Sequence, residues 1–459
     1  MCRRRVKTIA QTCRDLAVAA LALLALATAC RGADLGALVR SRLQSPSERV
    51  VAEGDRLLAA GQPQEALLAY REAVRRDERN VVALAKLAEA QARQGRARTA
   101  QRYWERAVAL SPELTPGPAM AALTPGPRPD TPLALRWQML VADDMPAGMA
   151  LADGVLYVAF DGGDVVALAA DGGAGRGGMT IWRTQLATRL IAPPAIVSGL
   201  VLLGGEDGVL YALDRRDGSR RWDYATGGAI YATPAVAGGL VYCPSHDGTL
   251  YALSLADGSL VWRFATGGWL HSAPTVAEGV VYFGSGNTRV YALDAATGAP
   301  VWEAGIPTLD VVESSPAVAD GRVLVGSGDS RLYCLAAASG GCYWFYSVSD
   351  AIVARPLVSG DTVYVAAMDG TLAALDLLSG AERWRVRLAT PLLMPPVAMG
   401  EWLLVVASAD PHLYALMAAD GELVWRMDTG DWLAMEPLLD EGALYLLGKD
   451  GTVLAFAAP

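Results

Sequence analysis

The chain has 459 residues, of which 53% are hydrophobic and 19% are charged. This composition excludes a disordered chain, and 6 cysteines are too few for a small disulfide-dense scaffold. With 39 basic and 48 acidic residues the net charge is −9, which argues against a nucleic-acid-binding protein because such proteins normally carry a basic field. Only 3 histidines are present, so few residues are available for histidine-based catalysis or a histidine-rich metal site.

Residues 1–29 have the order of a secretory signal peptide. A basic segment precedes residues 16–29, which carry no charge and are too few to cross a hydrocarbon core of ~30 Å as a helix. The stretch ends in Leu-Ala-Thr-Ala-Cys at residues 26–30, which resembles a bacterial lipobox with Ala27 in place of the usual leucine. The resemblance implies that Cys30 is lipidated and begins the mature chain. The alternative is an ordinary signal peptide with an incidental cysteine.

The lipobox resemblance also indicates where in the cell the protein is located. Residues 30–47 would form a lipidated N-terminal segment that anchors the protein to a membrane. Arg31 follows the cysteine, where lipoproteins kept at the inner membrane often carry aspartate. We therefore expect a periplasm-facing protein of the bacterial cell envelope, at the outer membrane rather than the inner one.

Residues 48–113 contain a repeat with a period of 34 residues. The pairs that recur are Gly61 and Gly95, Ala66 and Ala100, Tyr70 and Trp104, and Ala73 and Ala107. Small residues at fixed offsets allow two antiparallel helices to approach, and the aromatic residue fills the space between neighbouring hairpins. The pattern resembles two tetratricopeptide repeats. Such arrays usually need three or more repeats, so we expect support from a helix near residues 34–46, the next domain or a partner.

Residues 114–132 mark the clearest domain boundary. They contain Thr-Pro-Gly-Pro twice, at residues 115–118 and 124–127. Proline fixes φ and removes a backbone donor, so the sequence predicts a semi-rigid extended linker here.

From residue 133 to residue 459 the sequence repeats about every 40 residues. The strongest register is one of tryptophans, namely Trp137, Trp182, Trp222, Trp262, Trp302, Trp344, Trp384 and Trp425. Strand-like apolar runs lie between them, punctuated by Asp-Gly pairs that suit tight hairpins. Four short strands in each of eight repeats predict a mainly β protein, an eight-bladed β-propeller preceded by the small helical domain.

The two ends of the array predict how the ring closes. Trp137 precedes any complete repeat, and the last repeat ends before its own tryptophan. We expect residues 133–139 to form the outer strand of the final blade beside residues 452–457, because this pairing removes two open sheet edges.

The repeat itself indicates a superfamily. Residues 291–302, Tyr-Ala-Leu-Asp-Ala-Ala-Thr-Gly-Ala-Pro-Val-Trp, resemble the pyrroloquinoline-quinone-type propeller repeat, and looser copies occupy residues 211–222, 251–262 and 373–384. The resemblance implies that each register tryptophan docks between neighbouring blades. It also raises the question of catalysis, since the superfamily includes quinoprotein dehydrogenases.

Those dehydrogenases use adjacent cysteines, a catalytic aspartate and a Ca²⁺ held by oxygen ligands. This chain has no Cys-Cys dipeptide, and its propeller cysteines are Cys243, Cys334 and Cys342. We therefore expect no enzymatic activity, no cofactor and no metal. Cys334 and Cys342 flank a hairpin on neighbouring strands, so two alternatives stay open, a disulfide or two buried thiols.

Two groups of residues are candidates for a site. Polar residues of the inner strands, which we expect just before each recurring proline such as Pro234, should line the axial channel, with an ion pair between Glu313 and Arg355; they are Tyr231, His271, Glu313, Arg355 and Glu436. Loops that join an outer strand to the next inner strand share one face and carry the partner-binding candidates Trp269, Trp432, Asp310, Asp350 and Asp431. The alternative for the two tryptophans is that they cap the channel mouth or pack on a neighbouring loop.

The lipobox, the eight repeats and the missing catalytic set together resemble the BamB-type lipoproteins of the outer-membrane β-barrel assembly machinery. The resemblance implies a non-enzymatic scaffold with envelope proteins as partners, among them this machinery. The tetratricopeptide pair departs from the usual plan of the family and suggests a different or additional complex. The alternatives are a quinone-dependent dehydrogenase-like enzyme and a periplasmic ligand-sensing propeller.

Overall fold

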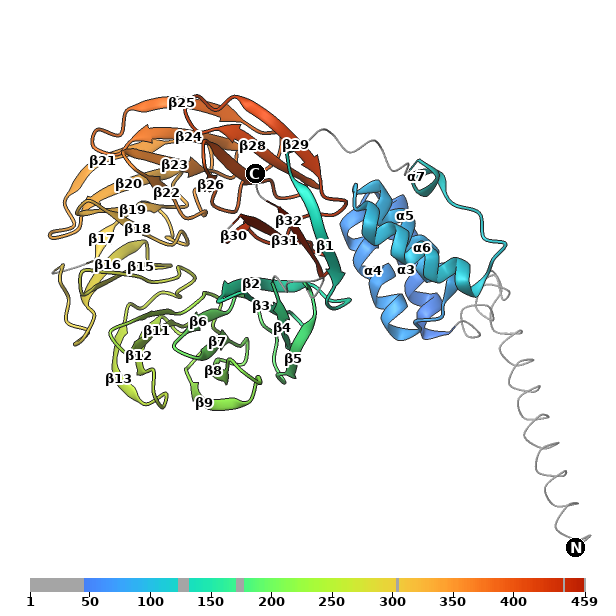
Figure 1. The fold of residues 1–459 in the computed structure, drawn as a ribbon, viewed down its shortest axis with the longest axis horizontal. Coiled ribbons are helices and arrows are strands. Elements are labelled where there is room, and N and C mark those ends of the chain that lie inside the picture. The colour runs from blue at the N-terminus through green and yellow to red at the C-terminus, as the bar shows by residue number, and fades with distance from the viewer. Residues whose placement is uncertain (1–44, 123–131, 171–176, 303–304, 441, 458–459) are drawn as a thin grey trace, which may run out of the picture. The chain divides into compact units, whose positions relative to one another are not determined.

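The protein was examined as a computed structural model that describes residues 45–122, 132–170, 177–302, 305–440 and 442–457. The chain divides into two compact units, one helical and one built of β-strands (Figure 1). The predicted signal peptide, the lipidation site Cys30 and the helix expected near residues 34–46 lie outside the described residues.

Four main helices form the helical unit: α3 (Pro46–Ala59), α4 (Pro63–Arg76), α5 (Val81–Arg93) and α6 (Ala97–Leu110). Ser45 and Glu48 form a reciprocal capping box at the start of α3, where the Glu48 N–H donates to Ser45 Oγ at 3.1 Å. Tyr70 of α4 is buried, and its hydroxyl donates to Asp55 at 2.7 Å. The two helix pairs have the lengths and order that the 34-residue repeat predicts; the tetratricopeptide assignment stays a prediction.

The segment expected to be an extended linker contains a further helix, α7 (Pro118–Ala121), so the prediction for residues 114–132 is wrong at these four residues, while residues 123–131 lie outside the described residues. The carboxylate of Glu89 on α5 accepts the backbone N–H groups of Ala119 at 2.9 Å and Met120 at 3.1 Å. Met120 is buried. Proline at the first position of α7 is compatible with a helix because its missing N–H would have no partner there.

The β unit consists of eight four-stranded antiparallel sheets within the described residues. The first four sheets are β2 (Pro146–Ala152), β3 (Val155–Phe160), β4 (Asp164–Ala169) and β5 (Thr180–Gln185); β6 (Ala195–Val197), β7 (Leu200–Gly204), β8 (Val209–Asp214) and β9 (Arg220–Ala225); β10 (Ala235–Ala237), β11 (Leu240–Pro244), β12 (Thr249–Ser254) and β13 (Leu260–Ala265); and β14 (Thr275–Ala277), β15 (Val280–Ser285), β16 (Arg289–Asp294) and β17 (Ile306–Pro307).

The other four sheets repeat the plan: β18 (Ala317–Ala319), β19 (Arg322–Gly326), β20 (Arg331–Ala336) and β21 (Cys342–Ser347); β22 (Leu357–Ser359), β23 (Thr362–Ala366), β24 (Thr371–Asp376) and β25 (Glu382–Arg387); β26 (Val397–Met399), β27 (Trp402–Val406), β28 (His412–Met417) and β29 (Leu423–Asp428); and β30 (Leu438–Asp440), β31 (Ala443–Leu447), β32 (Thr452–Ala457) and β1 (Ala134–Leu140). First strands of neighbouring sheets contact one another, as in β2 with β6 and β14 with β18, so they lie innermost. The predicted eight-bladed propeller is confirmed (Figure 1).

The predicted ring closure is confirmed as well. β1 pairs antiparallel with β32, from Ala134 opposite Ala457 to Leu140 opposite Thr452. The strand begins and ends one residue later than residues 133–139. The final blade is thus built from both ends of the array, and the edges of β1 and β32 that face each other are both paired.

The core lies between the faces of neighbouring blades. Along β3, Leu156, Val158 and Phe160 pack toward the final blade with Tyr445, whereas Tyr157 packs toward the next blade. Both faces of a middle strand are therefore buried, which explains why these strands are continuous apolar runs rather than alternating ones.

The register tryptophans join the blades. Each indole N–H donates to a backbone carbonyl in the next blade at 2.9–3.2 Å, in the pairs Trp137 to Ala170, Trp182 to Arg215, Trp222 to Leu255, Trp262 to Ala295, Trp302 to Ala337, Trp344 to Leu377 and Trp384 to Ala418. The position 33 residues after Trp425 is residue 458, outside the described residues. The structural role expected for this register is confirmed at these seven positions.

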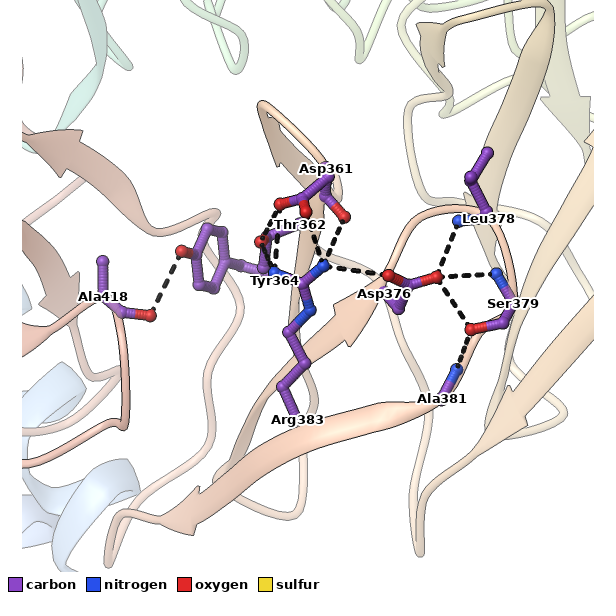
Figure 2. A network of polar contacts seen from close by, with 9 residues as sticks. All are labelled: Asp361, Thr362, Tyr364, Asp376, Leu378, Ser379, Ala381, Arg383 and Ala418. Atoms are coloured by element: carbon purple, nitrogen blue, oxygen red, sulfur yellow. Dashed lines mark hydrogen bonds and ion pairs between the residues drawn. The ribbon is translucent and has the colours of Figure 1, made fainter.

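The same carbonyl often receives a second donor from the blade. Figure 2 shows the Tyr364 hydroxyl donating to the carbonyl of Ala418 at 3.2 Å, the group that also accepts from Trp384. In the same blade Arg383 lies between two carboxylates, with its Nη2 atom 2.8 Å from Asp361 Oδ2 and 2.9 Å from Asp376 Oδ2 (Figure 2). Bonds from Arg383 and Ser379 hold the pKa of Asp376 well below its ordinary value of 3.8. The ionised carboxylate therefore keeps the turn after β24 in place.

We predict that the contact between tryptophan and glycine is tightly fitted. Gly258 has φ of 74°, and a Cβ there would lie 2.6 Å from the Trp222 ring, so Gly258→Ala should destabilise the fold by more than about 1 kcal/mol. Trp222→Phe loses only the N–H bond and some contact, about 1 kcal/mol. Urea unfolding measures both. Gly239→Ala is the matched control, because Gly239 has φ of 79° with nothing within 4 Å; an equal loss at Gly239 and Gly258 would contradict the packing argument.

A second prediction concerns acid. A carboxyl group with a folded pKa below its ordinary value stabilises the fold above that value, and the contribution is lost as pH falls through the folded pKa. Asp376→Asn should therefore lower the melting temperature at pH 7, and the difference from the parent chain should shrink steadily as pH falls below the ordinary value of 3.8 and Asp376 of the parent chain takes up a proton. Thermal melts across this range test it, and a difference that stays constant with pH would contradict it.

Candidate functional site

The turns between second and third strands and the loops from one blade to the next lie on one face, here called the loop face. Recurring aspartates organise its turns, each accepting a backbone N–H two residues later at 2.8–3.1 Å; they are Asp207, Asp247, Asp329, Asp369, Asp410 and Asp450. In Asp247 the second oxygen also accepts from the Tyr251 hydroxyl at 2.6 Å. These carboxylates are occupied by turn and strand contacts.

The predicted position of the channel-lining candidates on the inner strands is wrong, because the inner strands begin after the recurring prolines, as β10 does at Ala235, and the candidates lie in the segments before them. Their pairing also differs from the prediction. Glu313 Oε1 lies 3.6 Å from His271 Nδ1, and the ion pair expected between Glu313 and Arg355 does not form among the described residues. Arg355 is exposed, and its charge acts on Glu436 instead. Burial raises the pKa of Glu436 above the ordinary 4.5, against the opposing effect of Arg355.

Four rings gather on the loop face, and we call them the aromatic–imidazole cluster: Tyr231, His246, Trp269 and His271. His246 Nδ1 lies 3.0 Å from His271 Nε2. The Trp269 ring centroid is 4.3 Å from that of His271, and Tyr231 meets both imidazoles edge-on at 5.1–5.3 Å. Burial lowers the pKa of His271 below 6.5, while Glu313 opposes this shift.

Sequence analysis missed His246 as a member of this cluster. His246 lies in the turn between β11 and β12, whereas His271 lies in the loop before β14. The backbone N–H of His246 donates to the carbonyl of Ala229 at 2.8 Å, which holds this turn against the preceding loop. The signal that could have predicted this contact is the topology, because the turn with His246 and the loop with His271 belong to the same face of neighbouring blades.

The two candidate tryptophans pack on the turn beside them. The carbonyl of Trp269 accepts the Gly286 N–H at 2.8 Å, and the indole covers Gly286 so closely that a Cβ there would lie 2.5 Å away. The carbonyl of Trp432 accepts the Lys449 N–H at 2.7 Å, and Lys449 Nζ lies 5.5 Å from its ring centroid. Both indoles are partly buried, so this geometry matches the alternative of packing on a neighbouring turn.

The candidate aspartates occupy one repeated loop position. The carboxylates of Asp310, Asp350 and Asp431 each accept the N–H of the following residue, at 2.7, 2.8 and 2.6 Å. Asp310 and Asp350 are exposed, and Leu309 beside Asp310 is 72% exposed. Two neighbouring loops therefore present carboxylates and one apolar side chain to solvent.

Cys334 and Cys342 are free thiols, so the disulfide alternative is not the one found. A bulge between β20 and β21 places Cys334 opposite Trp344 and Cys342 opposite Leu335, so the two cysteines are not a directly facing pair. Cys334 is buried, as the thiol alternative expects, but Cys342 is exposed. Burial raises the pKa of Cys334 to about 12.

We predict selective labelling of these thiols. In the folded protein a maleimide should modify Cys342 and spare Cys334 and Cys243, because burial hides both thiols and raises their pKa values. Mass spectrometry before and after unfolding in urea measures this, with Cys342→Ser as the control that removes the folded-state label. A Cys334–Cys342 bridge in the non-reduced protein would contradict the prediction.

The described residues contain no group of three or more histidine, cysteine, aspartate or glutamate side chains placed to hold a metal ion. The adjacent cysteines are missing from the sequence itself. We therefore derive no step through a quinone or Ca²⁺. Among the described helices, none combines the length and apolar character needed to cross a membrane.

Fold and repeat define the class of the protein as a β-propeller of pyrroloquinoline-quinone-like repeats. A family model described as outer membrane protein assembly factor BamB matches residues 134–233, 225–311, 286–393 and 369–459. The chain belongs to this family. No curated protein matched in a sequence search.

Solved structures show the same fold. BamB from Moraxella catarrhalis has a TM-score of 0.61 at 22% identity, covering 71% of this chain and 97% of that chain. A quinohemoprotein alcohol dehydrogenase from Comamonas testosteroni has a TM-score of 0.61 at 17% identity, with 71% and 76% coverage. The computationally designed protein Ika8 has a TM-score of 0.61 at 14% identity, with 69% and 97% coverage. At these identities the likeness shows the fold alone.

Proposed function

We propose that this protein is a non-enzymatic scaffold of the bacterial cell envelope that acts in the assembly of outer-membrane proteins. The observation that carries the proposal is the family match over residues 134–459, the whole propeller. The described residues contain no group of three or more histidine, cysteine, aspartate or glutamate side chains placed to hold a metal ion, and the sequence has no adjacent cysteines, which supports the non-enzymatic part. Cys30 would carry the lipid that holds the protein at the periplasmic side of the outer membrane.

The partners in this proposal are envelope proteins, including the β-barrel assembly machinery. The loop face offers a binding surface, since Asp310, Asp350 and Leu309 are exposed on loops of neighbouring blades. Exposed carboxylates at the rim of an interface favour a basic partner surface and speed association more than they add affinity. Trp269 and Trp432 would then support the shape of this face rather than insert into the partner.

Deletion of the protein tests the proposal at the level of the cell. Outer-membrane barrel proteins should fall in abundance, and a chain with Cys30→Ala should restore them less well than the parent chain. Affinity purification of the tagged protein from solubilised membranes should recover a component of the barrel-assembly machinery. Unchanged barrel levels after a clean deletion, together with recovery of an unrelated complex, would overturn the assembly role.

The binding surface has its own test. Asp310→Asn combined with Asp350→Asn should slow association with the recovered partner about 3- to 10-fold at low salt, and the difference should shrink as salt rises. Asp320→Asn is the matched control, because Asp320 is also exposed but lies in the turn between β18 and β19, at the opposite end of the blade. Surface plasmon resonance measures the rates; an equal effect of Asp320→Asn would count against this face.

The non-enzymatic part is tested by titration with pyrroloquinoline quinone and Ca²⁺. We expect no stoichiometric binding and no dye reduction with alcohol substrates. Stoichiometric binding with dye reduction would overturn this part of the proposal and leave the family membership unchanged.

A further inference from the structure

Two of the three histidines in the chain meet on the loop face. His246 Nδ1 and His271 Nε2 face each other at 3.0 Å, although the residues come from different blades. Their ring centroids are 5.1 Å apart, and the ring planes differ by 27°. The two imidazole nitrogens are therefore within hydrogen-bonding distance, and the tautomer of each ring decides which nitrogen donates.

The surroundings hold the two rings in this arrangement. The second nitrogen of His271, Nδ1, faces Glu313 Oε1 at 3.6 Å, so a carboxylate lies behind the ring on the side away from His246. Trp269 and Tyr231 pack against the imidazoles from other directions. A carboxylate behind an imidazole is the usual second contact of metal-binding histidines, where it orients the ring and raises the basicity of the ligand nitrogen.

We propose that His246 and His271 form a binding site for a late divalent transition-metal ion, with copper(II) as the preferred ion. Two nitrogens 3.0 Å apart, each about 2.0 Å from a metal, subtend an angle of about 90° at that metal. This is the angle between neighbouring ligands in tetragonal copper(II), whereas a tetrahedral zinc ion would need the rings to separate slightly. Water or a partner's side chain fills the remaining positions.

Access and chemistry agree with this assignment. His246 is exposed and the His271 side chain is 29% exposed, so an ion reaches the pair from solvent. Imidazole is a preferred ligand of copper(II), and affinity along the divalent series is highest for that ion. The site is independent of the proposed assembly role, since it depends only on the geometry of these three side chains.

The test is a titration of the purified full chain with copper(II) at pH 7.4, in a Cys342→Ser background that removes the thiol exposed among the described residues. We expect one tightly bound ion, nitrogen superhyperfine structure from two imidazoles in the electron paramagnetic resonance spectrum, and quenching of tryptophan fluorescence that Trp269→Phe reduces. Zn²⁺ should bind more weakly in calorimetry.

Variants separate this site from other binding. His246→Ala and His271→Ala should each lower the affinity at least about tenfold, and Glu313→Gln should lower it about 10-fold while keeping the two-nitrogen spectrum. His412→Ala is the matched control, since His412 Nδ1 is bonded to Asp410 at 2.5 Å and lies away from the pair. No stoichiometric binding, or equal binding by the parent chain and the two alanine variants of unchanged melting temperature, would overturn the proposal.

Discussion

The propeller depends on one contact repeated around the ring, the indole of an outer strand lying against a glycine of the next blade. The N–H reaches a carbonyl of that blade, as from Trp222 to Leu255 at 3.1 Å, and the ring face leaves no room for a Cβ at Gly258. The contact combines burial of a large aromatic surface with a directed hydrogen bond, so it sets both the distance and the angle between blades. Because seven blades make this contact with the next among the described residues, the strands inside a blade are free to vary in sequence while the ring keeps its size.

The repeats made the fold predictable, and contacts between repeats made the site hard to predict. Registers of tryptophan and turn residues reveal the blade number and the pairing of β1 with β32, since those features recur at a fixed spacing. The neighbour of Glu313 depends on the offset between adjacent inner segments, which the repeat does not reveal. The sequence predicts Arg355 as the partner of Glu313, whereas the structure places His271 beside it. A single bulge likewise separates Cys334 from Cys342. The helix α7 is held by the carboxylate of Glu89, thirty residues away, and no local sequence pattern predicts that contact.

The loop face shows how a common scaffold acquires individual chemistry. Most of its carboxylates are used by the turns themselves, as with Asp247, so a recurring turn geometry and an acidic composition do not by themselves make a site. Residues that depart from the repeat can make a site. Here they are His246 in one turn, His271 in the next loop, and Glu313 one blade further on. Few histidines in the composition suggested little histidine chemistry, yet two of the three lie within hydrogen-bonding distance, because what matters for ligation is placement rather than number.

The pairing of β1 with β32 has a consequence for the order of synthesis. β1 is made before any other strand of the ring, yet its partner is the last strand described, so during synthesis the first strand stays an open edge while every intervening blade is produced. An unpaired edge is a template for pairing with other chains. The ring can close only after β32 has been made, so the interval in which β1 can pair with another chain lasts until almost the whole propeller has been synthesised.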